Sequence, residues 1–353
     1  MPRNCVRSSR PCARRTRPET VAGAIEEFAG HDRAFAREDL IGREQPLVIR
    51  GLAREWPLVR ERLSDAEFVA RLTAFDSGAA VDALVMPPEE EGLIGYNANF
   101  DGFNYEHRRV SVGQGLQRLL DLTPHERAPG VAIQSALISA CLPGFLSEHT
   151  LPFLDASVAP RIWIGNRVTT PAHFDEYHNI ACVLHGRRRF TLFAPEQIGN
   201  LYIGPLEFAP TGAAISLARL DRPDDPRFPR LKLALAAAHV ADLEPGDAIY
   251  IPPMWWHHVA SLEKINALVN YWWKFVRSDG YAPPTALGCL MHNVLSFRSL
   301  PPAEKRAWKA LLEHYVFGDN DPAEHIPAPR RGMLGPMTPE QVAKLRETIR
   351  RYL

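Results

Sequence analysis

The chain has 353 residues, of which 46% are hydrophobic and 23% charged, and its formal net charge is zero. This composition is ordinary for a globular protein with a sizeable core. No apolar run reaches the ~18 residues that a membrane helix needs, so we expect a soluble, cytoplasmic protein with no membrane partner. The five cysteines show no Cys-x-x-Cys spacing, which excludes a disulfide framework and a zinc knuckle from the prediction.

The charge is unevenly distributed along the chain. Residues 1–18 contain six arginines and no acidic residue, so this segment carries +6 and the remainder −6. The segment lacks the apolar stretch of a secretory signal and the aromatic residues that stack on bases. We therefore predict a flexible Arg-rich leader over residues 1–18 and no nucleic-acid partner, with a transit peptide as the alternative.

Residues 19–129 are predicted to supply α/β elements that support a following barrel. An amphipathic helix is expected from Ala22 to Phe28, and Ser64 is a capping residue for a later helix. The other expected elements are a strand over 46–51, a helix over 68–72, strands between 79 and 110, and a helix over 112–122.

Strands and turns dominate residues 130–280, the predicted catalytic core. The expected strands cover residues 161–169, 173–184, 187–193, 248–251 and 265–275. The proline-rich excursion 195–242 is long for a loop in a compact domain. Such loops often form a lid or one wall of a binding site.

Residues 281–353 are predicted to be helical. Trp308, Leu311 and Tyr315 belong to an apolar stripe with helical spacing, and Thr338 begins a Thr-x-x-Gln capping box with proline at the first helical position. Such stripes usually pack on their own domain. Two of them at the end of a chain also allow a homodimer through the C-terminal helices.

The most informative segment is Thr-Pro-Ala-His-Phe-Asp, which ends at Asp175. Alternate residues of a strand share a face, so His173 and Asp175 point the same way, and Tyr177 and Asn179 continue this polar face. A polar core-strand face needs a bound partner to satisfy it. The alternative to a binding site is that His173 and Asp175 form a hydrogen-bonded pair at the protein surface.

A second segment, Trp-Trp-His-His, can provide the missing histidine on another strand. Two histidines and one carboxylate on one side of a metal suit non-haem Fe(II) chemistry. Adjacent residues of a strand face opposite ways, so only one of His257 and His258 is expected to bind metal. The pattern alone does not choose between them.

Four separated motifs carry a family resemblance. In chain order they are Thr-Pro-x-His-x-Asp, Gly-Arg-Arg-Arg-Phe-x-Leu-Phe, Pro-Gly-Asp-x-x-Tyr-Ile-Pro-x-x-Trp-Trp-His-His and Asn-Tyr-Trp-Trp. Together they resemble the cupin-like Jumonji-C (JmjC) oxygenases, most closely the hydroxylase branch typified by the factor-inhibiting-HIF asparaginyl hydroxylase. The resemblance runs from about residue 19 to residue 275. It implies a mainly β fold with helical additions around a double-stranded β-helix (cupin, or jelly-roll) core.

The resemblance also implies Fe(II), with 2-oxoglutarate and O2 as cosubstrates. The implied metal ligands are His173, Asp175 and His257. Arg188 stands where the family usually has a lysine that binds the distal carboxylate of 2-oxoglutarate. A guanidinium can bind a carboxylate bidentately, and alternation places Arg188 on an inward, apolar face.

The remaining implied site residues fall into two groups. Those expected to bind the cosubstrate are Thr170, Asn179 and Asn270, and those expected on the substrate side are Gln134, Trp272 and Tyr96. Ala132 stands where the family has a tyrosine that contacts the cosubstrate.

The leading hypothesis is an Fe(II)- and 2-oxoglutarate-dependent dioxygenase that hydroxylates a protein or peptide side chain or a small molecule. Its reaction converts 2-oxoglutarate to succinate and CO2. The alternative is a non-redox cupin-like protein that binds a ligand or partner, for which Arg188 and Ala132 are the best support. A cupin independent of 2-oxoglutarate would favour a third histidine in place of the carboxylate. No reader domain or zinc finger is evident, so demethylation is the less favoured subclass.

Overall fold

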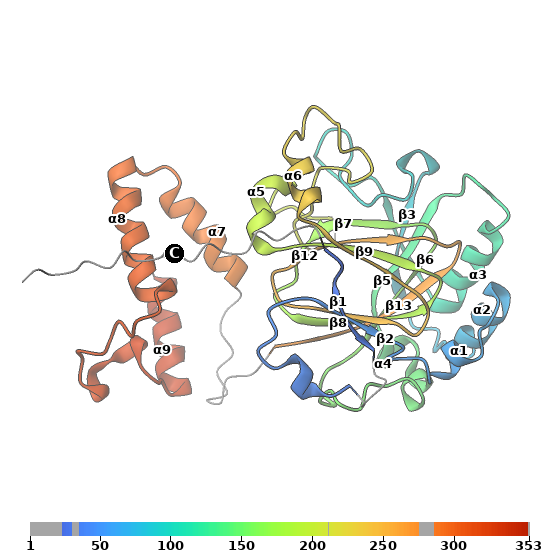
Figure 1. Cartoon of the computed structure of the whole chain (residues 1–353), viewed down its shortest axis with the longest axis horizontal. Coiled ribbons are helices and arrows are strands. Elements are labelled where there is room, and N and C mark those ends of the chain that lie inside the picture. The colour runs from blue at the N-terminus through green and yellow to red at the C-terminus, as the bar shows by residue number, and fades with distance from the viewer. Residues whose placement is uncertain (1–22, 30–34, 211, 275–285, 352–353) are drawn as a thin grey trace, which may run out of the picture. The chain divides into compact units, whose positions relative to one another are not determined.

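The structure is a computed structural model that describes residues 23–29, 35–210, 212–274 and 286–351. The predicted leader lies outside these ranges, as do the ends of the predicted segments at residues 22, 275 and 280. The chain forms two compact units, one up to Trp273 and one from Lys274 onward (Figure 1).

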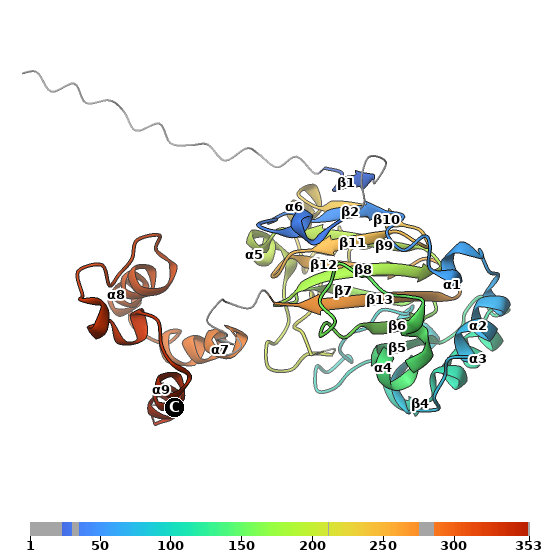
Figure 2. The same ribbon diagram turned by 90° about the horizontal axis from the view of Figure 1, so that it is seen from below.

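The first unit is built on two sheets that lie face to face (Figure 1), and Figure 2 looks onto the larger of them. The larger has the strand order β1-β2-β11-β8-β13-β6-β5-β3-β4, and the smaller has the order β10-β9-β12-β7. The strands are β1 Glu26–Ala29, β2 Leu47–Arg50, β3 Val81–Met86, β4 Glu106–Val110, β5 Gly130–Leu137, β6 Arg161–Gly165, β7 Thr169–His173, β8 His178–His185, β9 Arg188–Phe193, β10 His239–Leu243, β11 Ala248–Ile251, β12 Trp256–Ser261 and β13 Asn266–Trp273. Only β1 and β2 pair in parallel; the other pairs of these described strands are antiparallel.

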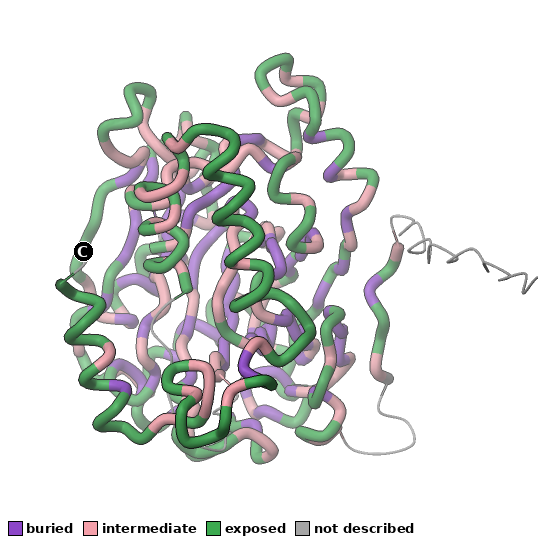
Figure 3. Tube along the Cα trace, turned by 90° about the vertical axis from the view of Figure 1, so that its left-hand side faces the viewer, coloured by how far each residue is buried: buried purple, intermediate pink, exposed green. Residues whose placement is uncertain are grey.

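Apolar side chains fill both faces of the larger sheet. Between the two sheets, Val183 and Leu268 meet Phe190 and Leu192 of the smaller sheet in an inner core. On the other face, an outer core joins the larger sheet to the helices α2 (Asp65–Thr73) and α3 (Val112–Leu122). Figure 3 shows long buried stretches of the chain trace, which are connected by mostly exposed stretches. The prediction of a mainly β, jelly-roll core with helical additions is confirmed.

The helices of the first unit follow local signals. They are α1 Pro57–Arg60, α2 Asp65–Thr73, α3 Val112–Leu122, α4 Ile138–Cys141, α5 Ile198–Leu201 and α6 Leu231–Ala236. Ser64 caps α2 as predicted, because the Glu67 N–H donates to its hydroxyl while the Glu67 carboxylate accepts from the Ser64 N–H at 2.9 Å. None of the described helices is long and apolar enough to cross a bilayer.

The predicted helix over 22–28 is wrong. Its described part contains β1, which pairs in parallel with β2. Ile25 is buried in the inner core, while Glu26 and Glu27 form ion pairs with Arg43 and Arg50. Tertiary pairing therefore overrides a weak helical pattern.

The predicted excursion also ends earlier than residue 242, because β10 already pairs with β9 from His239 onward.

The second unit is helical, as predicted. It contains α7 Ala286–Phe297, α8 Pro302–Leu312 and α9 Pro339–Arg350, and α9 begins with the expected capping box at Thr338. The stripe residues Trp308, Leu311 and Tyr315 are 43 to 49% exposed within the chain. A homodimer through this surface stays a prediction.

Candidate metal centre

A β-bulge shapes the strand that carries the first histidine. His173 on β7 pairs with His257 on β12, and Thr170 pairs with Val259, so three steps along β7 oppose two along β12. His257 and Val259 share a face, and Val259 lies in the inner core. The extra residue in β7 therefore turns both Thr170 and His173 inward, although strict alternation would place them on opposite faces.

The chain changes sheets directly after His173. β7 belongs to the smaller sheet and β8 to the larger, so residues 174–177 cross between them. The predicted single strand 173–184 is therefore wrong. Its supposed polar face is also divided, since Tyr177 is 44% exposed whereas Asn179 is buried.

Asp175 is placed by this crossing segment. Its backbone carbonyl accepts a hydrogen bond from the N–H of Met254 at 2.8 Å, which ties the segment to the turn before β12. This bond holds the carboxylate beside the two histidines. The positioning contact is therefore made by the backbone, outside any strand ladder.

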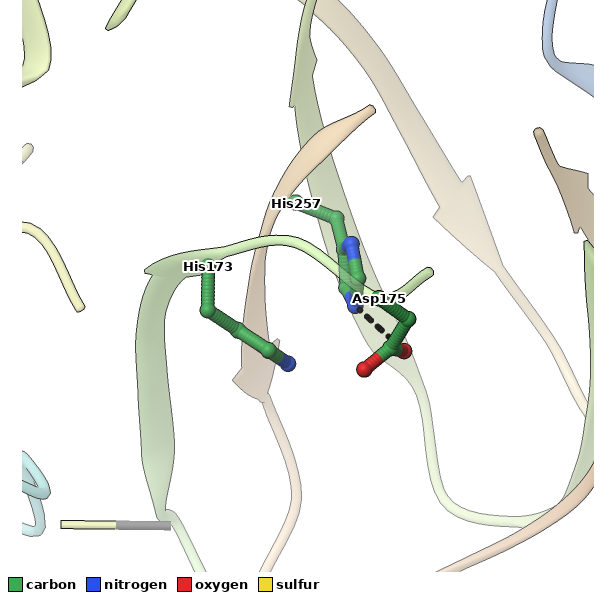
Figure 4. Close-up of side chains that lie close together, drawn as sticks. All are labelled: His173, Asp175 and His257. Atoms are coloured by element: carbon green, nitrogen blue, oxygen red, sulfur yellow. Dashed lines mark ion pairs between the residues drawn. The ribbon is translucent and has the colours of Figure 1, made fainter. Parts of the chain in front are cut away.

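His173, Asp175 and His257 converge on one point (Figure 4). One ligand atom from each residue lies within 4.8 Å of the other two. The His257 Nε2 is 3.6 Å from Asp175 Oδ2, and the two imidazole ring centres are 4.1 Å apart. These separations suit three donors around a single metal ion.

Backbone hydrogen bonds orient both imidazoles. His173 Nδ1 lies 2.9 Å from the Pro171 carbonyl oxygen, and His257 Nδ1 lies 3.1 Å from that of Trp255. Because a carbonyl oxygen only accepts, each Nδ1 carries the proton and donates it. Each Nε2 therefore presents a lone pair, which is the arrangement of a metal-ligating histidine.

The electrostatics of this group also favour a cation. Burial, followed by the nearby His173, lowers the pKa of His257 to about 4, so this imidazole is neutral at neutral pH. Asp175 Oδ2 is buried and has no hydrogen-bond partner among the residues that the structure describes. A buried carboxylate oxygen facing two imidazole lone pairs is costly without a positive ion between them. The donor set therefore fits a divalent metal.

Arg188 lies on the inner face of β9 and is only 8% exposed. Burial lowers the pKa of its guanidinium to about 10, and no acidic side chain pairs with it among the described residues. Within the described part of the chain its one hydrogen bond is long, 3.5 Å from Nη2 to the Trp163 carbonyl oxygen, and its Nε has no partner. A buried cation in this state fits an anionic ligand.

A small cavity adjoins Arg188. Its lining includes Ala132, Gln134, Trp163, Thr170 and Ser261. The structure thus brings the predicted residues Gln134 and Thr170 together with Arg188, and Ala132 leaves space beside the guanidinium. Sequence reasoning missed Trp163, although alternation along its strand predicts an inward position.

Further polar atoms on the inner face lack partners. The Asn270 Nδ2 donates to Asn179 Oδ1 at 2.7 Å, but Asn270 Oδ1 accepts nothing. Gln134 Oε1 and Trp272 Nε1 are likewise buried without a hydrogen bond. Buried polar groups are normally satisfied, so their concentration here indicates a site for a polar ligand.

Two residues singled out in the sequence lie elsewhere. His258 faces the outer side of the smaller sheet, where it lines a groove together with Tyr96. The Tyr96 hydroxyl donates to the Phe208 carbonyl oxygen at 2.6 Å. The structure therefore does not bring Tyr96 to His173, Asp175 and His257, the candidate metal-binding group.

Two facing sheets with two histidines and one carboxylate on their inner side define a cupin-type fold with a candidate metal site. The sequence profile of the Cupin-like domain family matches residues 32–278, and the chain belongs to this family, in its JmjC-related branch. Proteins with this domain are typically 2-oxoglutarate-dependent oxygenases. The narrower resemblance to the asparaginyl hydroxylase stays a prediction.

Several relatives carry the same domain. Jumonji C domain-containing protein 5 of Drosophila melanogaster is 36% identical over 46% of this chain and 38% of its own length. Lysine-specific demethylase JMJ31 of Arabidopsis thaliana is 31% identical over 36% of this chain and 23% of its own. JmjC domain-containing protein D of Dictyostelium discoideum is 26% identical over 65% of this chain and 52% of its own. The chain thus spans about a quarter to a half of these relatives.

Proposed function

We propose that the protein is an Fe(II)- and 2-oxoglutarate-dependent oxygenase that hydroxylates a protein or peptide side chain or a small molecule. The observation that carries this proposal is the buried, unpaired guanidinium of Arg188 inside the same barrel as the metal-binding group. A metal site alone would fit many cupins. A metal site with an interior cation for a dicarboxylate fits this class.

The chain's own residues would hold the metal through two neutral imidazole nitrogens and one carboxylate oxygen. Two histidines and one carboxylate are the donor set of non-haem Fe(II) oxygenases, and His173, Asp175 and His257 would leave room for the cosubstrates beside the metal. When bound there, Fe(II) with 2-oxoglutarate and O2 supplies the oxidising chemistry, and the cosubstrate leaves as succinate and CO2. The protein contributes position, orientation and a dry cavity.

Arg188 would hold the distal carboxylate of 2-oxoglutarate. A guanidinium in a low-dielectric cavity binds a carboxylate with two charge-assisted hydrogen bonds, and the ligand removes the cost of the unpaired charge. Thr170 lines the same cavity and offers a hydroxyl to the same group. Asn179 and Asn270 can provide amide contacts closer to the metal, because Asn270 keeps a free acceptor.

The substrate side is the less defined part of the proposal. Gln134 and Trp272 present a buried acceptor and a buried donor, which suits a substrate group with complementary hydrogen bonds. Tyr96 can reach substrate only through the outer groove that it lines.

Anaerobic calorimetry with Mn(II) tests the proposal directly. We expect 2-oxoglutarate to bind the Mn(II) protein, and its affinity to fall at least tenfold in Arg188→Met and in Asp175→Ala. In air with Fe(II), succinate should form and depend on His173. A non-redox cupin-like binding protein predicts neither binding nor succinate, and either absence would refute the oxygenase.

The mass of the modified substrate then separates the two oxygenase subclasses. Hydroxylation would add one oxygen atom from O2 to the substrate, about +16 Da, while the other oxygen atom would enter succinate. Demethylation would instead remove a methyl group from the substrate, which is the reaction that the name of the Arabidopsis relative gives for that protein.

A further inference from the structure

A second arginine, Arg161, lies on the inner face of the barrel. It begins β6, where its cross-strand neighbour on β13 is Asn270. Alternation along β6 puts Arg161 on the same face as Trp163, whose ring meets Trp272 edge-to-face at 6.1 Å. Ile162 points the other way into the outer core. The Arg161 side chain therefore shares the inner surface with the residues around the metal-binding group.

A second β-bulge holds this arginine in place. Ile133 pairs with Ile164 and Ala136 with Ile162, so β5 carries one extra residue opposite β6. In this bulge Ser135 has φ +48°, a left-handed conformation that costs a non-glycine residue about 1 kcal/mol or more and that clusters at functional sites. The Ser135 carbonyl accepts a hydrogen bond from Arg161 Nη1 at 2.8 Å.

Arg161 has no acidic partner among the described residues. The bond to Ser135 is its one hydrogen bond there, whereas a guanidinium has five N–H donors. Other arginines of the chain are paired: Arg50 contacts Glu27 and Asp247, and Arg189 contacts Asp242. Arg161 is partly buried, so its charge is screened less than a surface charge.

When the charges of the metal and the cosubstrate are counted, the positive charge of Arg161 has no negative counterpart in the site. With the metal and cosubstrate of the proposed function, Fe(II) and Arg188 supply three positive charges. Asp175 and the 2-oxoglutarate dianion supply three negative ones. The charge of Arg161 is then the surplus, and it lies on the same inner surface.

We infer that Arg161 binds an acidic group of the substrate, so that the protein acts on carboxylate-bearing molecules. This inference rests on the proposed function and specifies its substrate class. A single surplus charge and a planar guanidinium match one carboxylate, which it can bind through two parallel hydrogen bonds. The strained Ser135 carbonyl pre-orients the guanidinium for this contact.

Paired acid and amide probes test the inference without turnover. The peptide pair is acetyl-Gly-Glu-Gly-amide and acetyl-Gly-Gln-Gly-amide, and the small-molecule pair is propionate and propionamide. Binding is read from the broadening of probe proton signals by protein-bound Mn(II), with and without 2-oxoglutarate under argon. We expect the acid of at least one pair to bind about 10- to 100-fold more tightly than its amide. The pair that shows this preference separates a peptide side chain from a free acid.

The variants assign the preference to its residue. Arg161→Leu should abolish it, Arg161→Lys should restore part of it, and the outer-face control Arg189→Leu should keep it. Equal binding of acid and amide to the wild type, or a preference that survives Arg161→Leu, overturns the inference. The inference is also overturned if Arg161→Leu loses as much affinity for 2-oxoglutarate as for the acid probe, because Arg161 would then belong to the cosubstrate site. If 2-oxoglutarate fails to bind the wild type, the proposed function falls, while an Arg161-dependent acid preference with Mn(II) alone supports the anion site.

Discussion

Replacing Arg188 with methionine is expected to stabilise the apoprotein and to abolish its response to 2-oxoglutarate. Methionine keeps an unbranched side chain in the inner core but removes a guanidinium that is 8% exposed. Burial lowers the pKa of Arg188 from 12.5 to about 10. At about 1.4 kcal/mol per pKa unit, the folded state gives up about 3 kcal/mol to keep this group charged. The weak bond to the Trp163 carbonyl offsets part of this cost, so we expect a gain of about 1–3 kcal/mol in the free energy of unfolding.

Urea unfolding measures this gain, and thermal melting with Mn(II) measures the response to the cosubstrate. A ligand at 100 times its Kd stabilises the wild type by about 2.7 kcal/mol, whereas the variant should gain nothing from the same concentration. Arg189→Met is the matched control, because Arg189 is exposed and pairs with Asp242 at 2.7 Å. Destabilisation of the Arg188→Met apoprotein by more than about 1 kcal/mol would refute the reasoning, since the guanidinium would then have a partner in the folded state.

Three further predictions address the metal, the C-terminal unit and pH. His257→Ala should weaken Mn(II) binding at least tenfold by calorimetry, and an unchanged affinity would contradict the metal-binding group. In analytical ultracentrifugation, Leu311→Glu should convert the predicted homodimer to a monomer. A wild type that sediments as a monomer would contradict the dimer prediction. The apoprotein should lose stability as the pH falls below 6.5, because burial lowers the pKa of His149 and the unfolded chain then binds a proton that the folded chain does not. Between pH 7 and pH 5, the free energy of unfolding measured with urea should depend less steeply on pH in His149→Gln than in the wild type. An identical pH dependence in the two proteins would exclude His149 as the cause.

Elements with strong local signals could be predicted from the sequence. The helix over 112–122 has the expected bounds, and the helices after Ser64 and Thr338 begin at the expected caps. Caps and amphipathic spacing act within a few residues, so they are visible without tertiary contacts. The same holds for the strand over 248–251, which turn residues bound on both sides.

Features that depend on contacts between residues far apart in the sequence could not be predicted. β1 is a strand because β2 offers an edge, and its two glutamates find arginines far along the chain. The sheet change after His173 likewise depends on which sheet each strand joins. Nothing within residues 173–184 marks that choice, so a run of apolar residues after Asn179 was extended backwards into one strand. The position of Tyr96 in the outer groove, away from His173, Asp175 and His257, could not be predicted either, because the side of the sheet on which a loop settles is a tertiary property.

The three candidate metal ligands that the sequence predicts do converge in the structure, although part of the reasoning that led to them fails. Alternation works only while a strand keeps one residue opposite one, and this barrel breaks that rule on both sides of its interior. The bulge in β7 brings Thr170 and His173 to one face, and the bulge in β5 turns the Ser135 carbonyl toward Arg161. Each extra residue reverses the face to which the following side chains of its strand point. A prediction from strict alternation therefore misplaces the side chains on one side of the bulge. The chemical information comes instead from the residue types, which are a pair of histidines, a carboxylate and two interior arginines. Strand alternation does not provide it.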